Sequence, residues 1–337
     1  MKEAQNIGII GQGFVGTAVM KKFSQSFPVF AYDKTPGLSV ITGQGDSDTP
    51  PSPINFKTVV ENCNIIFVCV PTPMFEDGEC DTRMVEAVIE DIAKEAEFQN
   101  KEVVTIIKST VPPGTTETLN SLSNKVGVTF SPEFLTEANA TDDFENQTRI
   151  VLGIDYMEYI EPISSIFKTT FPGADLILIN SKEAEMTKYT TNLFLATKVS
   201  FFNDIYSLCE KLEINYDNVI EATIHDPRIG KSHYDVPGPD GDRGFGGHCF
   251  PKDLQAILAI SMKLGLGLPT ITGTHVTNMM VRKNKDWMDM EGRAVSTRPD
   301  TDTEIREEYP ANVEGSEEFY LASAGIDDDG MTEEDGK

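Results

Sequence analysis

The chain has 337 residues and a mass of 37.1 kDa, enough for about two domains that each bury a core. Its formal net charge of −26 argues against a nucleic-acid partner, because phosphate backbones are bound by a surplus of lysine and arginine. No apolar run approaches the roughly 20 residues of a membrane-spanning helix, so we also expect no membrane partner.

The N-terminus and the cysteines indicate a cellular compartment. A strand-like run begins at Ile7, which leaves no room for the regions of a signal peptide. The five cysteines lack the spacing of a disulfide framework and fit free thiols in a reducing environment. We therefore expect a cytoplasmic protein.

The first half of the sequence, residues 1–180, alternates apolar, β-rich runs with helical patterns. This alternation is typical of an α/β domain in which crossover helices cover a parallel sheet. Residues 38–55 are rich in turn-forming residues and predict a surface loop. The predicted strands are Ile7–Ile10, Val29–Tyr32, Ile65–Val70, Val103–Ile107, Val126–Phe130, Ile150–Leu152 and Leu176–Ile179.

The second half changes to helical patterns, which predict an all-helical domain over residues 181–290. Residues 181–212 contain neither glycine nor proline and predict one long helix that is capped at Ser181. Residues 291–337 form an acidic tail that predicts disorder, with 14 carboxylates from Pro299 onward. Further helices are predicted at Tyr216–Ala222, Asp253–Leu264 and Thr274–Met288.

The segment GQGFVG, residues 11–16, follows the first predicted strand and opens a helix, as a dinucleotide-binding turn does. Gly11 permits the tight turn, Gly13 admits a pyrophosphate, and Gly16 lets helix and strand pack closely. Asp33, about 20 residues on, is placed to bind ribose hydroxyls and would repel a 2′-phosphate, which favours NAD over NADP. The sequence thus predicts a Rossmann-type, doubly wound NAD-binding domain. The alternative is an ordinary strand-to-helix turn.

Polar residues follow two later strands. KSTVPPGTT places Ser109 and Thr110 at the carboxyl end of a predicted strand, where ligands of parallel sheets gather. In SPEFLTEA, Glu133 and Glu137 lie one turn apart if a helix begins at Pro132. The alternative is that these glutamates only stabilise the start of that helix.

Lys188 and Asn192 are four residues apart on the long predicted helix and therefore share one face. From spacing alone, two solvated polar residues on a surface helix are the more frequent explanation of this pair.

Cys249 lies in GFGGHCFPKD, behind flexible glycines and ahead of Lys252 and Asp253. Structural cysteines normally lie in apolar runs, whereas a nearby cation or helix N-terminus lowers the pKa of a thiol and creates a nucleophile. His248 is adjacent to Cys249 rather than at metal-ligand spacing, so we expect no metal site.

Seven segments, in this order over roughly residues 6–290, resemble the UDP-glucose/GDP-mannose dehydrogenase family: GQGFVG, VCVPTP, KSTVPPGTT, SPEFLTEANA, EAEMTKYTTNLFLATKVSFFNDI, DPRIG and GFGGHCFPKD. The resemblance implies an NAD-binding Rossmann domain and a central helical domain that forms a homodimer. It also implies a C-terminal Rossmann-like domain for the nucleotide. We find no such third domain after Met288, so the resemblance does not explain how the nucleotide is bound.

The resemblance implies oxidation of the C6 alcohol of a nucleotide sugar, UDP-glucose above all, to a carboxylate with two NAD. Cys249 resembles the nucleophile that forms a thiohemiacetal and then a thioester. Lys188 and Asn192 resemble the residues that stabilise the oxyanion, and Glu133 the base for the hydrolytic water. Asp253 and Thr110 resemble the groups that orient water and the basic residue.

The resemblance also implies two sets of binding residues. The cofactor set is Gly11, Gly13, Phe14, Val15, Gly16, Asp33, Lys34, Pro71, Thr72, Ser109, Thr110 and Glu137. The substrate set includes Arg228, which is expected to reach the site of a partner subunit. Its other members are Glu133, Phe134, Leu135, Glu137, Lys188, Asn192, Phe245, Gly246, Gly247 and Lys252.

Three other interpretations stay open. GDP-mannose and UDP-N-acetylhexosamine dehydrogenases share most of these motifs. A two-electron β-hydroxyacid dehydrogenase would use a Lys-x-x-x-Asn pair like Lys188 and Asn192 without a thiol. A truncated homologue would bind NAD and dimerise without turnover.

Overall fold

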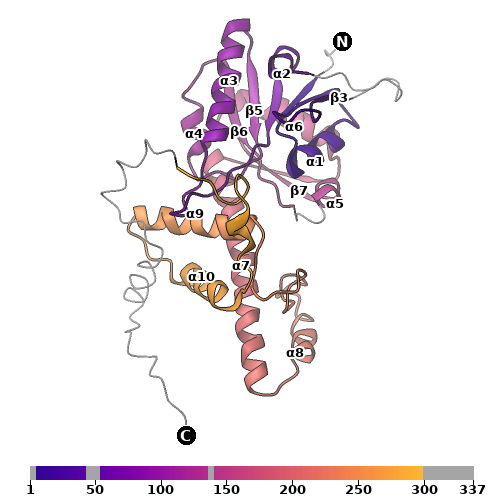
Figure 1. Cartoon of the computed structure of the whole chain (residues 1–337). Helices are drawn as coiled ribbons and strands as arrows, with labels where there is room; N and C mark the ends of the chain where they lie inside the picture. The colour runs from indigo at the N-terminus through magenta and orange to yellow at the C-terminus, as the bar shows by residue number, and fades with distance from the viewer. Residues whose placement is uncertain (1–4, 43–53, 136–139, 299–337) are drawn as a thin grey trace. The chain divides into compact units, whose positions relative to one another are not determined.

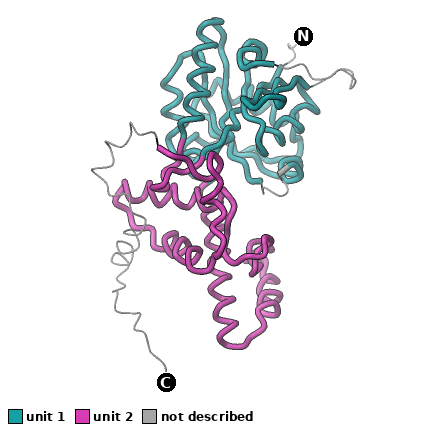
Figure 2. Tube along the Cα trace, viewed as in Figure 1, with its two compact units in different colours: residues 1–72, 82–188 teal, residues 73–81, 189–337 magenta. Residues whose placement is uncertain are grey.

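The computed structural model describes residues 5–42, 54–135 and 140–298 (Figure 1). The predictions for most of the 38–55 loop, for Glu137 and for the tail from Pro299 onward lie outside the described residues. The chain divides into two compact units (Figure 2). The first comprises residues 1–72 and 82–188, and the second comprises residues 73–81 and 189–337.

The first unit is built on an eight-stranded sheet with the order β3-β2-β1-β4-β5-β6-β7-β8. Strands β2, β1, β4, β5 and β6 are parallel neighbours, whereas β3 and β7 run antiparallel to β2 and β6. The strands are β1 (Ile7–Ile10), β2 (Val29–Tyr32), β3 (Val40–Thr42), β4 (Ile65–Val68), β5 (Val103–Ile107), β6 (Val126–Phe130), β7 (Arg149–Gly153) and β8 (Asp175–Ile179).

This sheet confirms the predicted α/β fold class, and every predicted strand is present. Strand β3 was missed because it is three residues long and lies among the turn formers of the predicted loop. Strand β4 ends at Val68, two residues before its predicted end.

Helices cover both faces of the sheet, because successive residues of a strand point to opposite faces. In β4, Ile66 and Val68 belong to one core cluster, and Ile65 and Phe67 belong to the other. Phe23 joins the second cluster, with its ring 4.8 Å from that of Phe67. The helices of this unit are α1 (Phe14–Phe23), α2 (Phe56–Asn62), α3 (Arg83–Gln99), α4 (Thr115–Leu119), α5 (Ala140–Glu145) and α6 (Met157–Thr170).

The second unit is helical. Residues 181–188 of α7 (Ser181–Lys211) belong to the first unit and residues 189–211 to the second. Helices α8 (Tyr216–Thr223), α9 (Cys249–Lys263) and α10 (Pro269–Val281) follow, and then a 3-10 helix, Asp286–Asp289.

Three helices differ from the predictions at their ends. The long helix is capped by Asn180 rather than Ser181, because the Asn180 Oδ1 accepts from the Glu183 N–H at 2.8 Å. Helix α9 begins at Cys249 instead of Asp253, since Pro251 is compatible with a first turn. The predicted helix 274–288 is wrong at both ends: α10 begins at Pro269 and stops at Val281.

The residues after α10 fold back onto residues 73–81 of the second unit. The Met74 N–H donates to the Ala294 carbonyl, and the Ser296 N–H donates to the Met74 carbonyl, both at 2.8 Å. Arg298 pairs with Asp77 at 2.7 Å. Residues 291–298, which the sequence analysis assigned to the tail, therefore form part of a packed contact. Among the described residues, no helix has both the length and the apolar character needed to cross a bilayer.

Candidate active site

The turn between β1 and α1 has the geometry of a phosphate-binding loop. Gly11 has a φ of +95°, and a Cβ there would lie 2.6 Å from the Cys69 carbonyl oxygen. A Cβ on Gly16 would lie 1.8 Å from the Gly11 oxygen, so helix and turn can approach only without a side chain. A Cβ on Gly13 would meet no atom within 4 Å, so its backbone faces open space.

The N-terminus of α1 suits an anion. Gly13 caps the helix without a side-chain hydrogen bond, and the first turn contains no acidic residue. Its N–H groups and the positive end of the helix dipole are therefore not neutralised by a carboxylate. These features fit the pyrophosphate of NAD.

Asp33 follows β2 and lies beside this turn. Its Oδ2 accepts from the Gln12 N–H and its Oδ1 from the Thr35 N–H, each at 2.7 Å. Burial raises the pKa of the Asp33 carboxyl, but these hydrogen bonds and the charge of Lys34 outweigh it and hold the pKa below its usual value. The resulting carboxylate has lone pairs left for ribose hydroxyls and repels a 2′-phosphate.

The predicted cofactor residues of the first unit come from loops at one edge of the sheet. The strand order reverses at β1, between β2 and β4, where ligands of such sheets bind. After β4, Pro71 is exposed and Thr72 is buried. After β5, the Ser109 hydroxyl donates to the Val70 carbonyl at 2.6 Å, and Thr110 is buried next to it.

Glu133 and Lys188 form a buried ion pair in the first unit, with 2.9 Å between Oε1 and Nζ. The other carboxylate oxygen accepts from the Leu135 N–H at 2.7 Å. Burial raises the pKa of Glu133, but the adjacent Lys188 outweighs it, so the pKa is lowered and Glu133 is ionised at neutral pH. The predicted helix from Pro132 is wrong, because residues 132–135 are not helical. Lys188 also lies 5.8 Å from the Phe134 ring centroid.

Lys108 is a buried cation of this site that sequence reasoning missed. Its Nζ donates to the Ser131 hydroxyl at 3.2 Å and to the Pro132 carbonyl at 3.0 Å, directly before Glu133. Burial lowers the pKa of Lys108 to about 8. The available signal was a lysine at the end of the apolar run that precedes Ser109.

A second polar cluster lies in the second unit around Asp253. One carboxylate oxygen accepts from the Asn192 amide at 2.5 Å, and the other accepts from the Lys252 ammonium at 2.6 Å. All three side chains are buried. Burial opposes the charged form of Lys252, but Asp253 and the nearby thiols of Cys80 and Cys249 outweigh it and raise the pKa of Lys252. The lysine predicted to contact substrate is therefore a buried, permanently charged partner of Asp253.

Cys249 is the first residue of α9 and, like Cys80 but unlike Cys63 and Cys69, is only partly buried. It interacts electrostatically with the Lys252 ammonium, and a helix N-terminus and a nearby cation are the surroundings in which cysteines act as nucleophiles. Burial raises the pKa of Cys63 and Cys69 to about 12 and that of Cys80 to about 11, which makes them poor nucleophiles.

The remaining predicted residues of the second unit lie in different surroundings. Phe245 is buried, with its ring 5.9 Å from that of Phe250. Gly247 has a φ of +69° and faces open space, whereas Gly246 lies against Arg282. Arg228 is 87% exposed and pairs with Asp226, so its reach to a partner subunit stays a prediction.

The structure therefore brings together two sets of predicted residues, each within one unit. Glu133 and Lys188 pair in the first unit, and Asn192, Asp253 and Lys252 join near Cys249 in the second. Lys188 and Asn192 occupy successive turns of α7, as their spacing predicts. Within the described part of the chain, no group of three histidine, cysteine or acidic residues is arranged to hold a metal ion.

Two family models match the chain. Residues 51–171 match the NAD binding domain of the UDP-glucose/GDP-mannose dehydrogenase family, and residues 182–280 match its central domain. A putative UDP-glucose 6-dehydrogenase of Bacillus subtilis, YtcA, is 37% identical over 210 residues, or 60% of this chain and 47% of the relative. The UDP-glucose 6-dehydrogenase of Rickettsia bellii is 33% identical over 252 residues, or 73% of this chain and 55% of the relative. The chain thus spans about half the length of the curated relatives it matches.

Solved structures agree with this match. A UDP-glucose dehydrogenase from Pyrobaculum islandicum superimposes with a TM-score of 0.72 at 26% identity, covering 83% of this chain and 69% of that one. A UDP-D-ManNAc dehydrogenase from Pyrococcus horikoshii shares the fold, with a TM-score of 0.66 at 20% identity. The match covers 82% of this chain and 69% of that one. The two family models together match more than half of the sequence. The chain belongs to the UDP-glucose/GDP-mannose dehydrogenase family, and NAD is its cofactor.

Proposed function

We propose that this chain oxidises the C6 alcohol of UDP-glucose to the carboxylate of UDP-glucuronate through a thioester on Cys249. The observation that carries this proposal is the position of Cys249, the first residue of α9, beside the buried Lys252–Asp253–Asn192 cluster. The names of the relatives from Bacillus subtilis and Rickettsia bellii support UDP-glucose as the sugar.

The reaction has two oxidations separated by a covalent step. NAD, which the turn of Gly11–Gly16 and Asp33 would hold, would supply the hydride acceptor for both oxidations. The alcohol first loses a hydride and a proton to give the aldehyde, and the Cys249 sulfur then adds to the aldehyde carbon. The thiohemiacetal loses a second hydride and a proton to become a thioester, and water releases the carboxylate and the free thiol.

Lys188 and Glu133 have complementary roles in this proposal. The Lys188 ammonium stabilises the oxyanion of each tetrahedral intermediate, and Asn192 shares this role. Glu133 is ionised at neutral pH, because its pKa is lowered, and it can accept a proton from the hydrolytic water. The proton-accepting form is lost as the pH falls through the lowered pKa of Glu133.

Asp253 holds the side chains of its neighbours in place. Its two oxygens hold the Asn192 amide and the Lys252 ammonium, so the orientation of Asn192 depends on the charge of Asp253. Lys252 supplies a fixed positive charge near the Cys249 sulfur. Thr110 keeps its predicted role in orienting water or a basic group.

Replacement of Cys249 tests the thioester. In Cys249→Ala, formation of UDP-glucuronate should fall by about 10⁴-fold or more, because the nucleophile is gone. Cys80→Ala is the matched control: Cys80 also lies near Lys252, but burial raises its pKa to about 11. Unchanged turnover in Cys249→Ala would contradict the proposal and favour a two-electron hydroxyacid dehydrogenase.

A non-catalytic role is the second candidate, and it is favoured by the length of the match, about half of each relative. In this role the chain binds NAD and associates with a longer enzyme without turnover. Titration of NAD followed by an assay with UDP-glucose separates the two, since NAD binding without NADH formation supports only the second.

We further propose that the chain forms a homodimer through α7. Phe194, Phe201 and Leu208 are seven residues apart, so they share one face of the helix, and they are 66%, 56% and 54% exposed. A second copy of the chain would bury this stripe. Sedimentation should give a dimer for the wild type and a monomer for Phe194→Glu/Phe201→Glu, and a wild-type monomer would contradict the proposal.

A further inference from the structure

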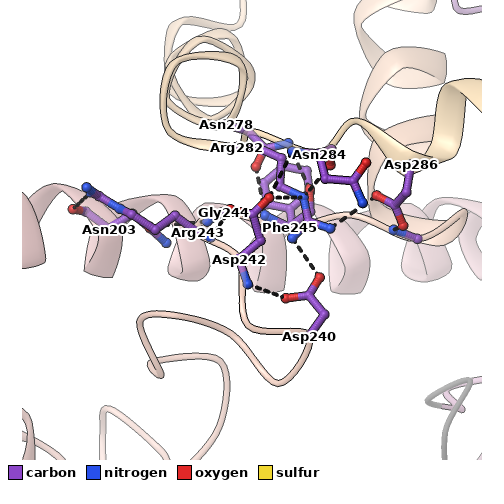
Figure 3. Close-up of polar contacts among 11 residues, drawn as sticks. Asn203, Asp240, Asp242, Arg243, Gly244, Phe245, Asn278, Arg282, Asn284 and Asp286 are labelled. Carbon is purple, nitrogen blue, oxygen red and sulfur yellow. Dashed lines mark hydrogen bonds and ion pairs between the residues drawn. The ribbon is translucent and has the colours of Figure 1, made fainter.

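Arg282, the residue after α10, is surrounded by acidic side chains (Figure 3). Its side chain is only 2% exposed. Its Nη1 lies 2.6 Å from Asp240, its Nη2 3.1 Å from Asp286 and its Nε 3.6 Å from Asp242. The Nε also donates to the Asn284 carbonyl at 2.7 Å. A buried guanidinium is tolerated only with such partners, so these contacts are mutually dependent.

This cluster lies directly against the glycine-rich segment that precedes Cys249. The Gly247 N–H donates to the second oxygen of Asp286 at 3.0 Å. A Cβ on Gly246 would lie 2.2 Å from the Arg282 Nη2 and 2.3 Å from the Asp286 Oδ1. The backbone at Gly246 therefore packs on the Arg282–Asp286 ion pair, where no side chain fits, and the Gly247 N–H is held by Asp286.

The same segment is held from two other helices. The Asn278 side chain of α10 accepts from the Phe245 N–H at 2.7 Å and donates to the Phe245 carbonyl at 3.0 Å. The Asn203 side chain of α7 accepts from the Gly244 N–H at 3.2 Å. Three of the four residues 244–247 are glycine, so without these contacts the segment would be conformationally free.

We infer that Arg282, acting through Asp286 and Asp242, is a positioning residue that holds the backbone of residues 244–247 and so fixes Cys249 at the start of α9. The inference rests on the proposed function, in which Cys249 is the nucleophile. Arg282 does not touch the thiol. Arg282 acts through residues 244–247, which end two residues before Cys249.

Two substitutions in the full-length chain test this role. Arg282→Lys keeps a positive charge but replaces the planar fork by a single point charge, so it cannot serve all three carboxylates. Asp286→Ala removes the acceptor of the Gly247 N–H and leaves Arg282 paired with Asp240 and Asp242. The matched control is Arg298→Lys, because Arg298 pairs with Asp77 and Glu79 in the same unit and contacts none of residues 244–247.

Three readouts are compared: steady-state kinetics over one concentration series of NAD and UDP-glucose, hydrogen exchange, and alkylation of Cys249. We expect kcat of Arg282→Lys and Asp286→Ala to fall about 10- to 100-fold, as a misplaced reacting group does. The KM for NAD should change by less than about twofold, because the predicted NAD contacts lie in other segments. Hydrogen exchange in residues 243–250 should accelerate, and alkylation of Cys249 by iodoacetamide should shift to higher pH. Arg298→Lys should resemble the wild type in all three.

The outcomes separate this inference from the proposed function. If Arg282→Lys does not fold, Asp286→Ala decides, because it keeps two of the three ion pairs. Folded variants with wild-type kcat, exchange and alkylation would overturn the inference. If Cys249→Ala retains turnover while both variants still accelerate exchange and alter alkylation, the positioning role stands and the thioester mechanism fails.

Discussion

Two glycine-rich segments of this chain lead into helix N-termini, and they differ in what holds them. Residues 11–16 are fixed by the backbone of the adjoining strands: the Gly11 N–H donates to the Tyr32 carbonyl at 2.9 Å, and the Cys69 N–H donates to Ile10 at 2.8 Å. Residues 244–247 are fixed by side chains distant in sequence, from Asn203, Asn278 and Asp286.

The difference has a physical consequence. A turn that is held by a sheet tolerates almost no change at its close contacts, because neighbouring backbone cannot move independently. A segment that is held by side chains is adjustable, because rotamers can shift at modest cost. The first arrangement suits a cofactor site of fixed shape. The second arrangement positions Cys249, the proposed nucleophile.

Gly16→Ala should have the largest effect on stability. Its Cβ would lie 1.8 Å from the Gly11 carbonyl oxygen, so backbone must move, and we expect a loss of about 3 kcal/mol in the free energy of unfolding. NAD affinity should fall with it. Urea unfolding and NAD titration measure both. Gly13→Ala, which meets no atom within 4 Å, should fold normally but bind NAD more weakly.

Gly246→Ala sharpens the comparison, since its Cβ meets the ends of two side chains rather than backbone. We expect a smaller loss of about 1–2 kcal/mol in the free energy of unfolding, because the Arg282 and Asp286 side chains can shift. The kcat should still fall, with KM for NAD unchanged. A stability loss as large as that of Gly16→Ala would show that the two segments are equally rigid.

Asp33→Asn tests the charge beside the first segment. The preference for NAD over NADP should fall by about tenfold, since the repulsion of a 2′-phosphate is removed. The ratio of kcat/KM for the two cofactors measures it. Asp175→Asn, at an exposed position of β8, removes the same charge elsewhere and should leave the ratio unaltered.

Lys108 gives stability a defined pH dependence. Its pKa is about 8 in the folded chain, below its usual value of 10.5, so between these limits the unfolded chain binds more protons. Stability due to Lys108 is therefore lost as the pH falls toward 8 and regained as it rises. Relative to Lys108→Met, the wild type should gain roughly 1–2 kcal/mol in unfolding free energy from pH 8 to 10. The exposed Lys21→Met should show no such change.

The sequence predicted features that depend on local pattern. The strands, the long helix and the turn of Gly11–Gly16 follow from periodicity and from residues that are close in the chain. The sequence analysis missed strand β3 and the start of α10 at Pro269, because each depends on weak or competing local signals. The helix considered at Pro132 does not form, since residues 132–135 are not helical.

The residues of the candidate site divide in the same way, into those that local pattern indicates and those that only the folded chain brings together. Lys188 and Asn192 were singled out by the resemblance as well as by spacing, and Cys249 by its unusual context, and their roles stay predictions. The roles of Lys108 and Arg282 were not found, because partners such as Ser131 and Asp240 are 23 and 42 residues away and only the folded chain brings them together. The structure also adds that Lys252 is a buried partner of Asp253, while its contact with substrate stays a prediction.

The amount of NADH formed per UDP-glucose tests the central claim most directly. With limiting UDP-glucose and excess NAD, the full chain should form two NADH and one UDP-glucuronate per sugar, and Cys249→Ala should form no acid. One NADH per sugar with no acid, or no NADH from a chain that binds NAD, would contradict the account.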